Sequence, residues 1–104
     1  MKLVLVQPQL DYAAGTHNIG HLRAQLAPFA STLGPHDVVL LPEHVVIETS
    51  RDAYRAAIAE LARELGCHVV GGSHHELRDA ERVNAGVVCD AAGEVVAEYE
   101  KLRP

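Results

Sequence analysis

Short, continuous apolar runs alternate with segments of helical periodicity over the first two thirds of this chain. The runs 2–7 (KLVLVQ), 37–43 (DVVLLPE) and 67–73 (CHVVGGS) contain many β-branched residues, which is typical of strands covered on both faces. A strand, helix, strand, helix, strand order implies right-handed crossover connections. The pattern therefore predicts an α/β fold whose sheet is mostly parallel.

Two helices are predicted between these strands. The first should run from Asn18, a suitable N-cap, to about Leu33, with Gly34 just past its end and Pro28 kinking or splitting it. The second should lie within 49–66, where Thr49 and Asp52 have capping-box spacing and Gly66 supplies the stop. Each helix has one apolar stripe: Ile19, Leu22, Leu26, Phe29, Ala30 and Leu33 in the first, and Tyr54, Ala57, Ile58, Leu61, Ala62 and Leu65 in the second.

The pattern changes after the polar stretch 74–82 (HHELRDAER), which we expect to be a solvated loop. The segments 83–90 and 94–102 flank Ala-Ala-Gly, and this arrangement predicts a hairpin with Gly93 in the left-handed position of the turn. The fold class is therefore a mixed, mostly parallel sheet with two helices and a C-terminal β-hairpin. No repeat, linker or low-complexity tract divides residues 1–104, so we expect one domain.

The charge and hydropathy of the chain indicate which kinds of partner to expect. The 104 residues include 9 Lys and Arg against 14 Asp and Glu, a net charge of −5, and they form no basic stripe for phosphates. A nucleic-acid partner is therefore not expected. The N-terminal apolar run is too short for a signal peptide or a membrane span, which predicts a cytoplasmic protein without a membrane partner.

Cysteine and histidine spacing gives no metal or redox site. Cys67 and Cys89 lack CxxC spacing and are interpreted as buried free thiols. The adjacent His74 and His75 would point to opposite faces of a strand, so they should not bind one ion together. Phosphate-cradle motifs fail as well, and we expect no cofactor. A nucleotide-binding flavodoxin-like domain, which has the same strand-helix rhythm, stays open as an alternative.

Two charged residues end apolar strands. Val39, Leu41 and Glu43 share one face of the second strand by alternation, and Lys101 ends the face that includes Tyr99 in the last strand. Ligand sites of α/β sheets form at the carboxyl ends of strands, so Glu43 and Lys101 are candidate catalytic residues, the base and cation of a buried pair. The competing interpretation is that both are solvated surface charges.

The order of these segments resembles the N-terminal part of the nitrilase, or carbon-nitrogen hydrolase, family over the whole chain. The most specific pieces are LLPE (40–43) and YEKL (99–102), supported by GGS (71–73) and the NAGVVCDAAG segment (84–93). The resemblance implies that residues 1–104 are the N-terminal portion of one carbon-nitrogen hydrolase domain, which is an α-β-β-α sandwich. It also implies that Glu43 is the general base and Lys101 the stabiliser of the tetrahedral intermediate.

The family's third catalytic group is a cysteine nucleophile that attacks an amide, nitrile or carbamoyl carbon. It lies beyond the lysine, whereas this chain ends three residues after Lys101, and neither Cys67 nor Cys89 matches its motif. The resemblance thus implies a small-molecule amide or nitrile as substrate and a homo-oligomer as assembly, with the segment alone inactive. The alternative is a catalytically inactive half-domain that binds a small molecule or a partner subunit.

Overall fold

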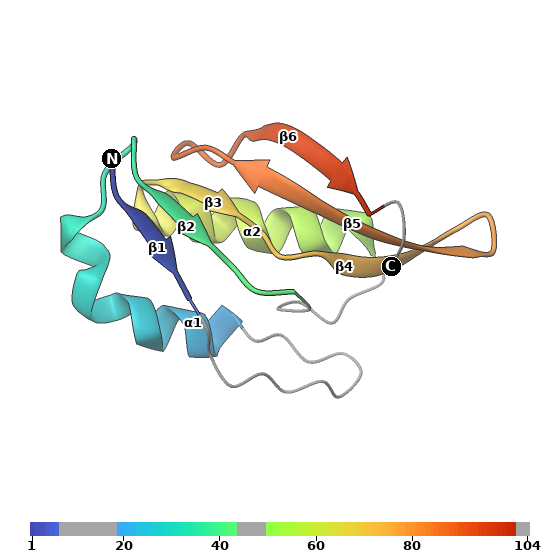
Figure 1. The fold of residues 1–104 in the computed structure, drawn as a ribbon, viewed down its shortest axis with the longest axis horizontal. Coiled ribbons are helices and arrows are strands. Elements are labelled where there is room, and N and C mark those ends of the chain that lie inside the picture. The colour runs from blue at the N-terminus through green and yellow to red at the C-terminus, as the bar shows by residue number, and fades with distance from the viewer. Residues whose placement is uncertain (7–18, 44–49, 102–104) are drawn as a thin grey trace.

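The computed structural model describes residues 1–6, 19–43 and 50–101, which form a mixed sheet with helices on one side (Figure 1). The fold class predicted from the sequence is confirmed. In chain order the elements are β1 (Leu3–Leu5), α1 (Ile19–Leu26), the 3₁₀ helix η1 (Ala27–Thr32), β2 (Val38–Leu40), α2 (Arg51–Leu65), β3 (His68–Val70), β4 (His74–Arg78), β5 (Glu81–Cys89) and β6 (Val95–Glu100).

Among the described residues the sheet has six strands. Its order is β1-β2-β3-β5-β4, with β6 on the other edge of β5. β1, β2 and β3 pair in parallel, whereas β5 is antiparallel to β3, β4 and β6. β2 and β6 therefore run in the same direction, and their carboxyl ends lie at the same edge. The antiparallel strand inside the sheet argues against a flavodoxin-like domain, whose sheet is parallel.

The first predicted helix is split as Pro28 suggested. The α-helix ends at Leu26, and η1 follows with the proline at its start. Because a 3₁₀ helix has three residues per turn, the stripe expected over 18–33 is interrupted after Leu26. Phe29 is 54% exposed rather than buried, whereas Ala30 and Leu33 still pack against the core and are partly buried. The N-cap predicted at Asn18 lies outside the described residues.

The second predicted helix is confirmed as α2, with one change at its start. Ser50 is the N-cap, and its hydroxyl accepts a hydrogen bond from the backbone N–H of Ala53 at 3.2 Å. Thr49 lies outside the described residues. Gly66 ends the helix in the left-handed conformation, at φ 65°, as expected.

The predicted solvated loop over 74–82 is wrong. Residues 74–78 form β4, which pairs with the start of β5 through a tight turn in which Asp79 and Ala80 both have positive φ. The strand was not predicted because its residues are polar, although two of them are buried by contacts with α2. His74 is 1% exposed and stacks on Tyr54, with ring centroids 3.9 Å apart, and Glu76 is 4% exposed and accepts hydrogen bonds from Arg51. The C-terminal hairpin of β5 and β6 is confirmed, with Gly93 at φ 82°.

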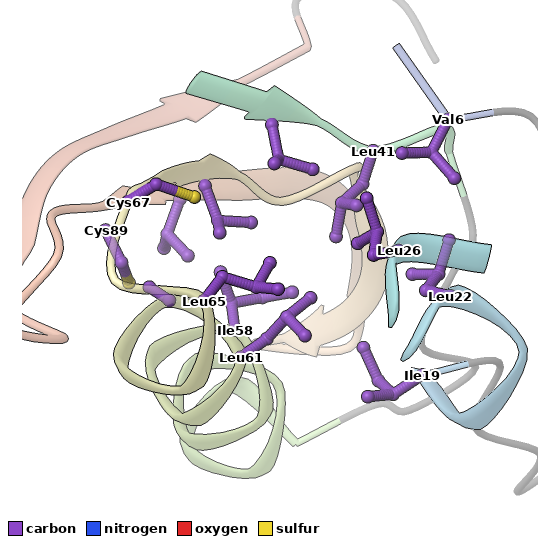
Figure 2. Packing of buried hydrophobic residues seen from close by; sticks show 14 of the residues in the cluster. Val6, Ile19, Leu22, Leu26, Leu41, Ile58, Leu61, Leu65, Cys67 and Cys89 are labelled. Carbon is purple, nitrogen blue, oxygen red and sulfur yellow. The ribbon is translucent and has the colours of Figure 1, made fainter. Parts of the chain in front are cut away.

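The two faces of the sheet differ in cover. Val39, Val69 and Cys89 are neighbours in register and fully buried against the helices; we call this side the covered face. Figure 2 shows Ile58 and Leu61 of α2 and Leu22 of α1 pointing into the same cluster. Leu3, Leu5 and Leu40 belong to the other side, the open face, and are 60%, 65% and 37% exposed. No helix among the described residues is long and apolar enough to cross a membrane.

Candidate active site

Glu43 and Lys101 meet at the edge of the sheet where β2 and β6 end. Glu43 lies in the turn that follows β2, and Lys101 comes directly after β6. Lys101 Nζ forms an ion pair with Glu43 Oε1, and the Lys101 backbone N–H donates to Asn84 O at 2.9 Å. The structure thus brings together two residues that are far apart in the sequence, at the place where α/β sheets form ligand sites.

Glu43 is not buried, contrary to the expectation from its position after an apolar run. Its side chain is 55% exposed, while that of Lys101 is 30% exposed. The reason is that Glu43 stands two residues beyond buried Leu41 in a turn at the rim of the sheet, rather than within a packed layer. In the described residues this ion pair faces solvent on one side, so water screens it.

Gly72 fixes where the chain leaves β2. A Cβ at Gly72 would lie 1.6 Å from the backbone oxygen of Pro42 and 3.0 Å from the backbone nitrogen of Glu43. The two backbones can therefore approach this closely only because position 72 has no side chain. The hydrogen bond from Leu41 N–H to Val70 O, 3.0 Å long, continues the pairing of β2 and β3 up to this contact. The GGS segment of the sequence thus positions the glutamate of the LLPE segment.

Tyr54 contacts the backbone of Gly71 and Gly72 from the covered face. Its hydroxyl lies 3.0 Å from Gly71 O and 2.7 Å from Gly72 O, and it accepts a hydrogen bond of 3.2 Å from the Val87 backbone N–H. Burial raises the pKa of this phenol, so it stays a neutral donor. Helical periodicity predicted Tyr54 in the core but gave no sign of this polar contact.

Tyr99 contacts the backbone of Gly71 from the open face. Its ring occupies the space beside Gly86, its partner in register on β5, and its hydroxyl donates to Gly71 O at 3.0 Å. Because Val87 is buried on the covered face, Gly86 and Tyr99 belong to the open face. Alternation then places Lys101, two residues after Tyr99, on the open face too.

Cys67 and Cys89 lie at the opposite end of the sheet. Cys67 immediately precedes β3, and Cys89 ends the antiparallel strand β5, so both are at the amino ends of the parallel strands (Figure 2). Both are free and buried, which confirms the interpretation from their spacing, and burial raises the pKa of each thiol. Neither is placed to act on a carbon held between Glu43 and Lys101, and a thiol with a raised pKa is a poor nucleophile at neutral pH.

His74 belongs to the covered face of the sheet, where it stacks on Tyr54. His74 Nε2 lies 3.9 Å from Glu76 Oε2, and Arg51 makes a two-pronged contact with the same carboxylate, at 2.5 and 3.0 Å. No group of three or more His, Cys, Asp or Glu side chains in the described part of the chain is arranged to hold a metal ion.

Comparison with known proteins gives the fold. No family model matches the sequence, and no curated protein matches it significantly. Solved structures do match. A carbon-nitrogen hydrolase from Helicobacter pylori G27 matches with a TM-score of 0.74 and 16% sequence identity, and the match covers 97% of this chain and 39% of the hydrolase chain. A cysteine-to-serine variant of an amidase of the nitrilase superfamily from Nesterenkonia AN1 has a TM-score of 0.73 and 21% identity, over 98% of this chain and 43% of its own.

A second structure of that Nesterenkonia amidase, a glutamate-to-glutamine variant, shows acrylamide added to the active-site cysteine. It has a TM-score of 0.72 and 21% identity, over 97% of this chain and 44% of its own. The chain therefore has the fold of carbon-nitrogen hydrolases of the nitrilase superfamily. It spans less than half the length of these structures, which agrees with the N-terminal part indicated by the sequence.

Proposed function

We propose that this chain supplies the glutamate and the lysine of a carbon-nitrogen hydrolase whose cysteine lies outside these 104 residues. The observation that carries the proposal is the ion pair between Glu43 and Lys101 at the carboxyl ends of β2 and β6. The fold supports it, since the similar structures are a carbon-nitrogen hydrolase and an amidase with an active-site cysteine. In this view residues 1–104 are the N-terminal portion of a single hydrolase domain.

The chemistry follows from the charges of the pair. Glu43, as general base, takes the proton of the cysteine thiol while the sulfur attacks the carbonyl carbon of an amide. The Lys101 ammonium stabilises the negative oxygen of the tetrahedral intermediate. The intermediate collapses to a thioester when Glu43 passes this proton to the nitrogen, which leaves as ammonia or an amine. Glu43 then takes a proton from water while the water oxygen attacks the thioester carbon, and it gives this proton to the departing thiolate, which returns the thiol and releases the acid.

The same proposal assigns the rest of the biochemistry. The substrate is a small amide, nitrile or carbamoyl compound, and the reaction uses no cofactor or metal. The assembly is a homo-oligomer in the cytoplasm, without a nucleic-acid or membrane partner. The exposed apolar side chains of the open face support only the claim that residues 1–104 are part of one hydrolase domain, because in an α-β-β-α sandwich a second sheet packs against that side.

The test is Glu43→Gln in the full-length protein, assayed for release of ammonia or an amine from simple amides and nitriles. Removing a general base should lower kcat about 10²- to 10⁴-fold. Glu60→Gln on the exposed side of α2 is the matched control and should keep wild-type turnover. Cys67→Ala and Cys89→Ala should also stay active. Wild-type turnover in Glu43→Gln would contradict the assigned role.

A second candidate is a catalytically inactive half-domain that binds a small molecule or a subunit. It is favoured by the position of both cysteines at the edge opposite Glu43 and Lys101. A stop codon directly after Pro104, together with a soluble chain that melts cooperatively, would support it. A reading frame that continues into a strand ending in cysteine would exclude it.

A further inference from the structure

Asn84 has a buried side-chain oxygen that lacks a hydrogen-bond partner in the part of the chain that the structure describes. It lies in β5, is 5% exposed, and its Oδ1 makes no hydrogen bond within the described ranges 1–6, 19–43 and 50–101. An unsatisfied buried acceptor costs about 1–3 kcal/mol, so most buried polar atoms have partners. A side chain of this kind in a core strand needs an explanation beyond packing.

The register places Asn84 directly beside Lys101. Ala85 pairs with Glu100, and the next pair along the two strands is Asn84 with Lys101, joined by the hydrogen bond of 2.9 Å from Lys101 N–H to Asn84 O. Opposed residues of antiparallel strands have their side chains on the same face, with Cβ atoms about 4.5–5.5 Å apart. The Asn84 carboxamide and the Lys101 side chain therefore leave the sheet side by side.

Lys101 needs a second acceptor during the proposed reaction. In the structure its ammonium pairs with Glu43, but a general base becomes protonated when it works, and a neutral carboxyl no longer holds a cation strongly. The ammonium must stay charged and aimed at that moment, because that is when negative charge forms on the substrate oxygen. A carboxamide oxygen is suited to this task, since it accepts a hydrogen bond and does not titrate.

We propose that Asn84 is a positioning residue for Lys101: its Oδ1 accepts a hydrogen bond from the Lys101 ammonium when Glu43 is protonated. This inference rests on the proposed function and adds a residue to its site. Among the described residues, the other charged or titratable groups that the register places near Lys101 are Glu100 and Tyr99 of β6, and His75, which opposes Asn84 on β4. The Asn84 carboxamide, which is neutral, would help to keep the lysine charged without adding a charge that competes with Glu43.

The direct test is NMR titration of the Lys101 Nζ in the full-length protein, with Glu43→Gln as the background that imitates the protonated base. Adding Asn84→Ala should lower the pKa of Lys101 by at least ~0.5 unit, the effect of losing one hydrogen bond to the charged form. Asn84→Asp, which is isosteric and keeps an acceptor, should raise it. Ser73→Ala removes a different buried polar group, a hydroxyl that also has no hydrogen-bond partner in the described part of the chain, and should leave the Lys101 pKa unchanged.

Kinetics separate this inference from the proposed function. With Glu43 intact, Asn84→Ala should lower kcat at least tenfold with KM within twofold of wild type, and should move the alkaline limb of the pH profile to lower pH.

An unchanged Lys101 pKa in both Asn84 variants overturns the inference even if the enzyme is active. If Asn84→Ala does not fold, the direction in which Asn84→Asp shifts the Lys101 pKa decides alone. A wild-type protein that hydrolyses no amide or nitrile instead overturns the proposed function, and the titration still decides whether Asn84 holds Lys101.

Discussion

The covered and open faces of the sheet differ in exposure and in polarity. The covered face is apolar and almost inaccessible: Val39, Val69 and Cys89 are each 0% exposed beneath the helices. The open face has exposed leucines at β1 and β2. It also carries the polar groups near the site, Asn84 on β5 and Lys101 directly after β6. One face therefore supplies most of the free energy of folding, while the other holds the candidate catalytic residues at its rim.

The largest contrast should come from truncating a leucine on each side. Leu61→Ala removes a fully buried side chain of α2 and should lower the free energy of unfolding by about 2–5 kcal/mol. Leu5→Ala on the open face, where the side chain is 65% exposed, should change it by less than about 0.5 kcal/mol. Urea unfolding of both variants measures the difference. Equal losses would show that the open face is packed in solution.

Two glycines give the next contrast. A Cβ at Gly71 would lie 2.8 Å from both Ile58 Cγ1 and the Tyr54 hydroxyl on the covered face, so Gly71→Ala should cost about 1–3 kcal/mol through overpacking. A Cβ at Gly86 would meet the Tyr99 ring, which can swing toward solvent because it is 38% exposed. Gly86→Ala should therefore cost less, about one hydrogen bond or 0.5–1.5 kcal/mol. Thermal melts would contradict this ranking if Gly86→Ala were the more harmful change.

A smaller, pH-dependent effect is expected at Asp37, which precedes β2. Hydrogen bonds from the backbone N–H of Lys2 (2.7 Å) and then of Gly34 (2.8 Å) lower the pKa of this carboxyl. A depressed folded pKa gives stability that is present above the unfolded value and is lost as pH falls through the folded value. Asp37→Asn should thus lower the melting temperature at pH 7, and the gap to wild type should shrink below pH 4. A gap that persists in acid would contradict the charge-based account.

The smallest effect should come from the outer surface of the helices. Arg23 makes a two-pronged contact with Glu64, at 2.7 and 2.9 Å, but both side chains are more than 40% exposed. Exposed pairs of this kind contribute about 0.2–1 kcal/mol, and salt screens them. Arg23→Ala should therefore change the free energy of unfolding by less than 1 kcal/mol at low salt, and by less again at 1 M NaCl. Chemical denaturation at the two salt concentrations measures this, and a loss independent of salt would indicate packing by the arginine stem instead.

Local rules in the sequence predicted most of the regular elements. Apolar periodicity and Gly66 predicted α2, Pro28 predicted that the first helix is split, and Gly93 predicted the last turn. These features could be predicted because each depends only on residues that are neighbours in the chain. The rule failed for β4, whose residues look solvated. His74 and Glu76 are buried there because Tyr54 and Arg51 of α2 satisfy them, and no pattern within 74–78 shows those partners.

The sequence by itself determined which residues carry charge at the strand ends, Glu43 and Lys101, because alternation and apolar runs are local properties. Only the tertiary structure decided that the two side chains touch, that Glu43 is half exposed, and that Asn84 stands beside Lys101. These facts depend on strand order and register, which bring residues separated by tens of positions to one edge. Register is set by the packing of the whole sheet, so it cannot be read from any single segment.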